Sequence, residues 1–272
     1  MSTVETRDYP KAVDLPDGVR DSVRDLILVL ADSKRLLGMR YGNWILGAPE
    51  LEAGIACASM AQDEWGHARL LYALLRDFGE DVDRLEHGRE PAAYRSIDVL
   101  DVEPQSWPEL VAVNALVDAA LTLQLEALAE SAYVPLRQRV QKLLEEETFH
   151  AAHGSAWLRR IAAAGTDGRA TMQQAVAALV PPILRWFGPD SERGRALQNA
   201  SITNASGTEM RTRFAGRIAP LVRVLESADA FSALEPDFAG FDEAARRMSG
   251  TAPDERTIRQ VRGDLNRAFL MD

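Results

Sequence analysis

The sequence QDEWGH, residues 62–67, contains the pattern Glu-x-x-His, and EETFH, residues 146–150, repeats it in the second half of the chain. Residues three apart on a helix project from one face, so Glu64 with His67, and Glu147 with His150, each present a carboxylate beside an imidazole. Two such pairs, with one carboxylate from each of two more helices, form the ligand set of dinuclear metal sites inside four-helix bundles. The repeat therefore predicts a helical bundle built around a metal pair.

The composition is that of a globular protein with a substantial core, since 46% of the 272 residues are hydrophobic and 26% are charged. A net charge of −10 argues against a nucleic-acid surface. The single cysteine, Cys57, excludes an internal disulfide and a cysteine-rich metal site, which leaves carboxylates and four histidines as candidate ligands. A polar N-terminus and the lack of an apolar run near twenty residues predict a soluble, cytoplasmic protein without a membrane partner.

Apolar residues recur at helical spacing through most of the chain, and this predicts an all-α fold. Core helices are expected at about 21–46, 49–78, 106–132 and 135–164, with a long connection at 80–105 and further helices at 170–187, 207–227 and 255–270. Ser106 with Glu109, and Ser206 with Glu209, match capping boxes, while Pro181-Pro182 should kink or break its helix. We expect one domain over 1–272, with an extended arm (1–18), a four-helix metal-binding core (19–165) and accessory helices (166–272).

Counting from the turns suggests the other two ligands, because residues at one height in a helical hairpin lie equally far from its turn. With a turn near residue 48, Glu64 lies 16 residues beyond it (64 − 48) and Asp32 lies 16 before it (48 − 32). With a turn near residue 133, Glu147 lies 14 residues beyond (147 − 133), so its opposite falls at 119, next to Asp118. The predicted metal ligands are thus Asp32, Glu64, His67, Asp118, Glu147 and His150.

Two of these ligands have alternatives. Asp32 follows an apolar run in which an unpaired carboxylate would be costly, and a salt bridge with Lys34 or Arg35 is the other interpretation. Glu126 also lies on the third helix, but about two helical turns from the level of the metals. His153 has no matching carboxylate and is expected to lie outside the group of ligands.

The segment WILGAPELE, residues 44–52, followed by Asp63 and by GHAR, residues 66–69, resembles the phenylacetate catabolic protein family, the ferritin-like subunits of phenylacetyl-CoA 1,2-epoxidase. The resemblance runs from about residue 24 to 165. That family has a catalytic subunit with a diiron centre and a structural subunit in which the ligands have largely decayed. The APELE turn looks like the structural, C-type subunit, yet this chain keeps both Glu-x-x-His pairs.

The resemblance implies a ferritin-like four-helix bundle with additional C-terminal helices, and it implies three further roles. In diiron oxygenases an acidic residue often precedes the Glu of Glu-x-x-His and orients a ligating histidine across the bundle. Asp63 and Glu146 match that position, although each could be a solvated acid. Thr122 resembles a threonine that many diiron monooxygenases place beside the oxygen pocket, and the alternative is a hydroxyl bonded to its own backbone.

The predicted ligand set suits two iron ions that cycle between Fe2+ and Fe3+, with manganese as an alternative. We expect a diiron monooxygenase that activates O2 to epoxidise or hydroxylate a small organic substrate, and the resemblance suggests an aromatic acyl-CoA thioester. No iron–sulfur cysteine set or flavin fingerprint is present, so electrons would come from a separate reductase. We also expect a homo- or hetero-oligomer with related helical subunits. The alternatives are a non-catalytic structural subunit of a multicomponent phenylacetyl-CoA oxygenase and a ferritin-like ferroxidase.

Overall fold

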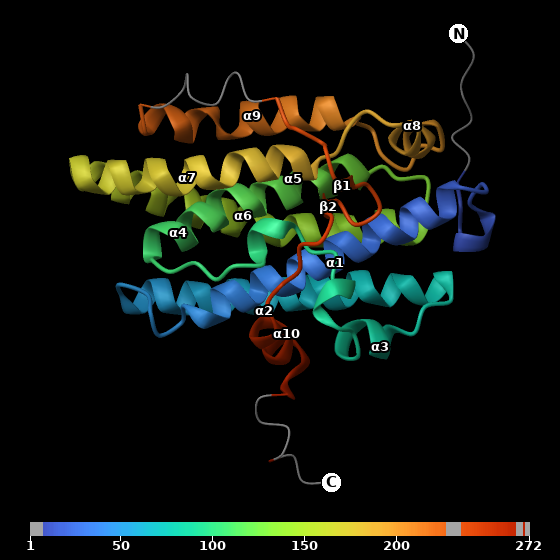
Figure 1. Cartoon of the computed structure of the whole chain (residues 1–272), viewed down its shortest axis with the longest axis horizontal. Helices are drawn as coiled ribbons and strands as arrows, with labels where there is room; N and C mark the ends of the chain where they lie inside the picture. The colour runs from blue at the N-terminus through green and yellow to red at the C-terminus, as the bar shows by residue number, and fades with distance from the viewer. Residues whose placement is uncertain (1–7, 227–234, 265–268, 270–272) are drawn as a thin grey trace.

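The computed structural model describes residues 8–226, 235–264 and 269, and its helices stack in layers (Figure 1). The first layer is the hairpin of α1 (Val19–Asn43) and α2 (Leu51–Leu74). The second contains α6 (Val134–Ala163) and one continuous helix made of α4 (Trp107–Ala112), the π-helical segment η5 (Val113–Asp118) and α5 (Ala119–Leu128). The third layer, α7 (Thr166–Trp186) and α9 (Gly207–Val224), packs on the second. The expected all-α, ferritin-like bundle is confirmed.

Shorter elements connect the layers. They are η1 (Ala12–Asp14), η2 (Leu75–Phe78), α3 (Val82–His87), η3 (Pro91–Ala93), η4 (Asp98–Leu100), α8 (Glu192–Asn199), β1 (Phe241–Asp242), β2 (Arg247–Met248) and α10 (Glu255–Arg262). The prediction missed α8 and the antiparallel β1–β2 hairpin, because two-residue strands are too short to show alternation. Of the two expected effects of Pro181-Pro182, the break was wrong, since α7 continues through both prolines, and the kink stays a prediction.

The helix ends follow local sequence signals. Gly79 adopts a left-handed conformation (φ 83°) directly after η2 and ends the second core helix where expected. The Ser206–Glu209 capping box is formed in full. At α4 only half of the box is present, because Ser106 Oγ accepts the N–H of Glu109 while the Glu109 carboxylate accepts the N–H of Gln105.

Small residues set the close approach of α1 and α2. A Cβ atom added to Gly38 would lie 2.6 Å from the indole of Trp65, so only glycine leaves room for that ring. The N-terminal arm is tied to the end of the second core helix, where Asp77 Oδ2 accepts the N–H of Ala12 at 2.6 Å, and to the connection between α5 and α6, where Tyr9 N donates to Ala132 O at 2.7 Å. The part of the predicted arm before residue 8 lies outside the described residues.

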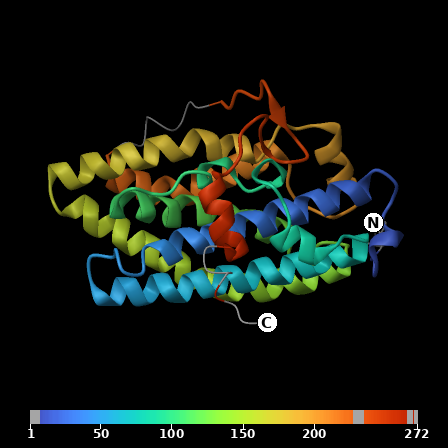
Figure 2. The same cartoon turned by 60° about the horizontal axis from the view of Figure 1, so that its bottom comes forward.

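The C-terminal strap, residues 241–262, crosses over α1 (Figure 2). Buried arginines fix it in place. Arg40 of α1 donates to Leu100 O at 3.1 Å and to Thr257 Oγ1 at 3.3 Å. Arg247 of β2 donates to Ser96 O at 3.1 Å and forms an ion pair with Asp101. The strap and the connection before α4 therefore cover the outer side of α1.

One helical stretch, Trp107–Leu128, is long and apolar enough to cross a membrane by composition, which the sequence analysis did not notice. In the fold, 83% of the most apolar 18-residue window of this stretch is buried inside the protein. Its hydrophobicity is accounted for by its position in the middle layer, where helices cover it on both sides.

Cys57 lies on the buried face of α2 and is fully inaccessible. Burial raises the pKa of its thiol from 9.0 to about 11. We expect no reaction with a thiol-specific reagent near neutral pH in the native protein, and one reactive thiol per chain after unfolding, because the thiolate is the nucleophile.

The raised pKa of Cys57 also determines how the stability of the fold changes with pH. Folding favours the neutral thiol, so this contribution to stability is complete below pH 9 and is lost as the pH rises through about 11. A Cys57→Ala variant should lose less stability across that range than the parent chain in denaturant titrations. Rapid labelling of native protein would contradict the placement of Cys57.

Candidate functional site

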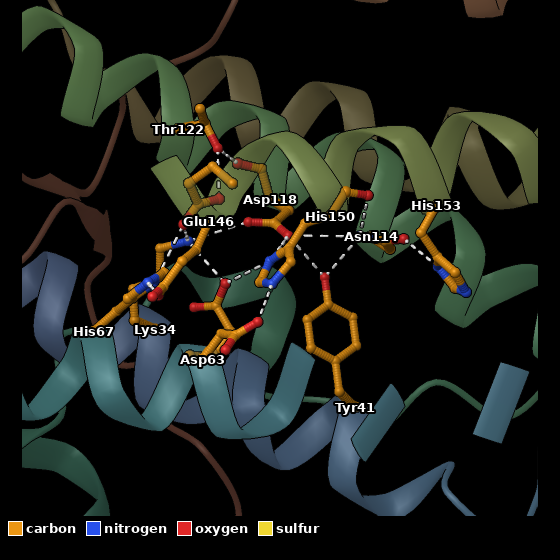
Figure 3. A network of polar contacts seen from close by, with 12 residues as sticks. Lys34, Tyr41, Asp63, His67, Asn114, Asp118, Thr122, Glu146, His150 and His153 are labelled. Atoms are coloured by element: carbon orange, nitrogen blue, oxygen red, sulfur yellow. Dashed lines mark hydrogen bonds and ion pairs between the residues drawn. The ribbon is translucent and has the colours of Figure 1, made fainter. Parts of the chain in front are cut away.

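The ammonium group of Lys34 occupies the centre of the bundle, where the sequence predicts metal ions. Its Nζ lies 2.5 Å from Glu147 Oε1, 2.9 Å from Glu64 Oε1 and 3.1 Å from Asp118 Oδ1 (Figure 3). Lys34 is 0% exposed and the three acids at most 2%. A single cation from α1 therefore pairs with one carboxylate from each of α2, η5 and α6. We refer to these four residues as the lysine–carboxylate cluster.

Two histidines close the cluster from either side. His67 Nδ1 lies 3.2 Å from Glu147 Oε1, and His150 Nδ1 lies 3.0 Å from Asp118 Oδ2 and 3.2 Å from Glu64 Oε1. Each histidine is thus placed beside the carboxylate of the opposite Glu-x-x-His motif. Five of the six predicted ligands are brought together in this way.

The outer nitrogen of each histidine contacts an acid across the bundle. His67 Nε2 lies 2.6 Å from Glu146 Oε2, and His150 Nε2 lies 3.3 Å from Asp63 Oδ2. Both acids are partly exposed, with side-chain exposures of 45% and 30%. The contacts have the crossed arrangement that the sequence analysis expected of Asp63 and Glu146, and they orient both imidazole rings.

Asp32 does not join the other predicted ligands. Its carboxylate is buried on the opposite side of α1, where it forms an ion pair with Arg89 and accepts the backbone N–H of Arg95 at 2.7 Å and the hydroxyl of Tyr72. The count from the turn gave the right height but the wrong face. A helix turns by about 100° per residue, so Asp32 and Lys34 point about 200° apart.

Asp118 comes from a π-helical segment, a rare conformation that is often found at functional sites. The same segment contributes Asn114, whose Nδ2 donates to Tyr41 Oη at 3.0 Å, while Tyr41 donates to Asp118 Oδ2 at 3.0 Å. The alternative ligand, Glu126, instead pairs with Arg217 in a partly exposed ion pair. Within the third core helix, the structure thus brings Asp118 to the cluster.

Thr122 lies one turn after Asp118, and its hydroxyl bonds both to the backbone of its own helix, as one interpretation expected, and to a carboxylate of the cluster. Its hydroxyl is 2.9 Å from Asp118 O and 2.8 Å from Glu147 Oε2. His153 is outside the cluster, as expected, with Nδ1 3.1 Å from Asn114 Oδ1. Nothing in the sequence pattern pointed to Tyr41 or Asn114, and Lys34 was considered only as a salt-bridge partner of Asp32.

The charges in the cluster determine one another's ionisation. Burial would lower the pKa of Lys34, but Asp118, Glu147 and Glu64 outweigh it and raise that pKa well above its ordinary value. Burial likewise opposes protonation of His150, yet the hydrogen bonds of Asp118 and Glu64 raise its pKa to about 11. Burial is also the largest influence on the pKa of His67, but Glu147 and Glu64 together outweigh it and raise that pKa.

The carboxyl groups respond in opposite directions. Burial is the largest influence on the pKa of Asp118, but Lys34 and His150 overcome it and hold that pKa far below its ordinary value. Burial raises the pKa of Glu64, against the attraction of Lys34, and Glu64 Oε2 has no hydrogen-bond partner among the described residues. Asp118 is therefore the acid that the two cations hold most firmly in its ionised form.

The three carboxylates of the cluster face three basic groups, the Lys34 ammonium and the imidazoles of His67 and His150, and the pKa of each of these groups is raised. Glu64, Asp118, Glu147 and His150 do place one donor atom each within 4.8 Å of one another, so they could hold a metal ion. That ion would have to take the position of the Lys34 ammonium.

The buried ion pair of Asp32 with Arg89 gives a stability prediction. Arg89→Met should reduce the free energy of unfolding by about 3–5 kcal/mol, because it leaves a buried charge without its partner. Adding Asp32→Asn should recover part of that loss. Urea titration of the four proteins of the double-mutant cycle measures the coupling. The matched control Arg84→Met, at an exposed position of α3, should change stability by less than about 0.5 kcal/mol. An equal effect of the two arginine variants would contradict the ion pair.

Comparison with known proteins agrees with this architecture. The chain is 27% identical over 231 residues to the A-type subunit of 1,2-phenylacetyl-CoA epoxidase from Escherichia coli (strain K12), a match that covers 82% of this chain and 72% of the relative. It is 29% identical over 198 residues to the C-type subunit of the same enzyme, a match that covers 70% of this chain and 78% of the relative. The family model described as phenylacetic acid catabolic protein matches residues 5–229. This chain therefore belongs to the phenylacetic acid catabolic protein family.

Proposed function

We propose that this chain is a non-catalytic, structural subunit of a multicomponent oxygenase that acts on phenylacetyl-CoA or a similar aromatic acyl-CoA thioester. The observation that carries the proposal is the position of the Lys34 ammonium among Glu64, Asp118 and Glu147. Similarity to two different subunits of one epoxidase supports membership in such a complex. The oxygen chemistry and the metals would belong to a related helical subunit, with electrons from a separate reductase in the cytoplasm.

The residues present do not fit a diiron centre. Such a centre takes four carboxylates and two histidines, and here the helix that should supply the fourth carboxylate supplies Lys34 instead. Two Fe2+ ions with Lys34 charged would leave three negative against five positive charges in a fully buried site. An uncompensated buried charge of that size is strongly unfavourable.

In this proposal the cluster has a structural task. Lys34 connects α1 to α2, η5 and α6 through charge-assisted hydrogen bonds in the buried interior. Such a buried network specifies how the four helices align, because any other alignment would leave charges unpaired. Glu146 and Asp63 hold the two imidazole rings from outside. The protein then keeps the shape of the family while giving up its chemistry.

A diiron monooxygenase is the second candidate, and the retained Glu-x-x-His pairs and the position of Thr122 beside Glu147 favour it. It requires Lys34 to leave the cluster and a further ligand to replace it. Asp32 is not available for this, because Arg89 holds it on the far side of α1. A ferroxidase role meets the same obstacle, since it also needs metals where Lys34 lies.

Metal content tests the proposal directly. After anaerobic incubation with Fe2+ and desalting, the purified chain should retain far less than one iron per chain, because Lys34 occupies the cation position. Lys34→Glu completes the ligand set of a diiron site and should increase retained iron towards two per chain. Inductively coupled plasma mass spectrometry measures both values.

The matched control is Lys142→Glu, the same change at an exposed position of α6, which should leave iron content unchanged. If Lys34→Glu folds only with metal present, circular dichroism with and without Fe2+ records that dependence. Two irons per chain in the unmodified protein would sink the structural assignment and favour the diiron monooxygenase.

Activity and assembly give a second test. We expect no O2 consumption by this chain with a reductase and phenylacetyl-CoA, and restored consumption when a metal-bearing member of the family is added, with both chains in one complex by size-exclusion chromatography. Since Lys34 acts only inside this bundle, turnover should depend on the metal of the partner. Turnover by this chain alone would refute the proposal.

A further inference from the structure

A small cavity lies where α8 and the β1–β2 hairpin meet α1 and α5, and its lining includes no residue of the lysine–carboxylate cluster. Its volume is about 60 Å³. Apolar side chains and glycines form much of its wall, and its polar lining includes Gln124, Ser191, Arg193, Thr203, Ser206 and Arg246. We call it the Arg246 cavity. None of the groups discussed for the proposed function lines it.

Arg246 brings a positive charge to this cavity without an acidic partner. Its Nη1 donates to Gln124 Oε1 at 2.5 Å, and its guanidinium lies 5.4 Å from the ring centroid of Trp186. Among the described residues, no carboxylate lies within ion-pair distance of it. Burial and the charge of Arg193 lower its pKa to about 10, which leaves it protonated at neutral pH. A half-buried cation without an acidic partner favours an anion beside it.

Arg193 adds to the positive charge rather than cancelling it. Its Nη2 lies 2.6 Å from Asp25 Oδ2, but the same carboxylate also pairs with Arg95 at 2.6 Å and with Arg24 at 2.9 Å. One carboxylate is thus shared by three guanidinium groups. Glu243 is the acid in the cavity lining, and it is exposed at the rim. Arg24 has two further acidic partners, Asp21 and Glu80, so the charge left without an acid among the described residues is that of Arg246.

A hydroxyl group and a fixed backbone complete the site. Thr203 Oγ1 is buried in the cavity wall and has no hydrogen-bond partner among the described residues. Arg246 has a φ of +50°, which is uncommon for a residue other than glycine. Asp242 Oδ1 fixes this turn by accepting the N–H groups of Ala244 at 2.8 Å and Ala245 at 3.1 Å. The turn therefore presents the Arg246 side chain to the cavity in a defined position.

We propose that the Arg246 cavity binds a phosphate group, with Arg246 and Arg193 as charged donors and Thr203 as a hydroxyl donor. Guanidinium groups recognise phosphate through paired, charge-assisted hydrogen bonds. A cavity of this size holds only a few water molecules, so a tetrahedral oxyanion fits and a larger acid does not enter completely. The inference does not depend on the proposed role of the chain in an oxygenase.

The test is isothermal titration of the full chain with sodium phosphate, against sodium chloride at matched ionic strength. We expect saturable binding of one phosphate per chain and a higher melting temperature. Arg246→Gln should weaken binding by about tenfold or more, because it removes the unpaired charge. The control Arg139→Gln, at an exposed position of α6, should bind phosphate like the parent chain.

Thr203→Val keeps the test decisive if Arg246→Gln folds poorly. Its hydroxyl has no partner in the free protein, so the variant should keep its stability and still bind phosphate more weakly. Titration with adenosine monophosphate identifies the source, since equal or tighter binding indicates an organic phosphate and weaker binding indicates the free ion. No phosphate binding beyond the chloride control, or unchanged binding in Thr203→Val and Arg246→Gln, would overturn the proposal and leave a cavity filled with water.

Discussion

The attraction between one buried ammonium group and three buried carboxylates is the constraint on which the bundle depends. Removing four charged groups from water is costly, and only close pairing and complete hydrogen bonding offset that cost. Lys34 meets this condition from α1, while the acids come from three other helices. The histidines and their outer acids complete a network in which each charged group touches one of opposite sign. The alignment of the helices and the pairing of the buried charges therefore depend on each other in this protein.

Much of this arrangement could be predicted from the sequence, for reasons that also explain the error. Glu-x-x-His fixes the relation of two side chains on one helix, and counting from a turn fixes height, so Glu64, His67, Glu147, His150 and Asp118 were found. Neither rule fixes the face of a helix. On most helices the apolar stripe shows which face points to the core. Residues 25–34 of α1 are all buried, so hydrophobicity could not show whether Asp32 or Lys34 faces the centre of the bundle.

The complete burial of this part of α1 has its cause in segments without periodic patterns. The connection before α4 supplies Arg89 and the backbone N–H of Arg95 to Asp32. The strap supplies a hydrogen-bond acceptor, Thr257 Oγ1, to Arg40 of α1. Contacts made by irregular segments depend on tertiary structure and leave little trace in local sequence. The four-helix core could be predicted from the sequence. The segments that cover α1 and pair with Asp32 on its outer side could not.

The strap also determines when, during synthesis, the contacts of α1 can be completed. Arg35 and Arg40 belong to α1, yet they donate to Val261 O at 2.7 Å and to Thr257 Oγ1 at 3.3 Å, 226 and 217 residues further along the chain. During translation these guanidinium groups have no access to those partners until more than two hundred further residues have left the ribosome. Until then the outer side of α1 stays open to chaperones and to other unfinished chains.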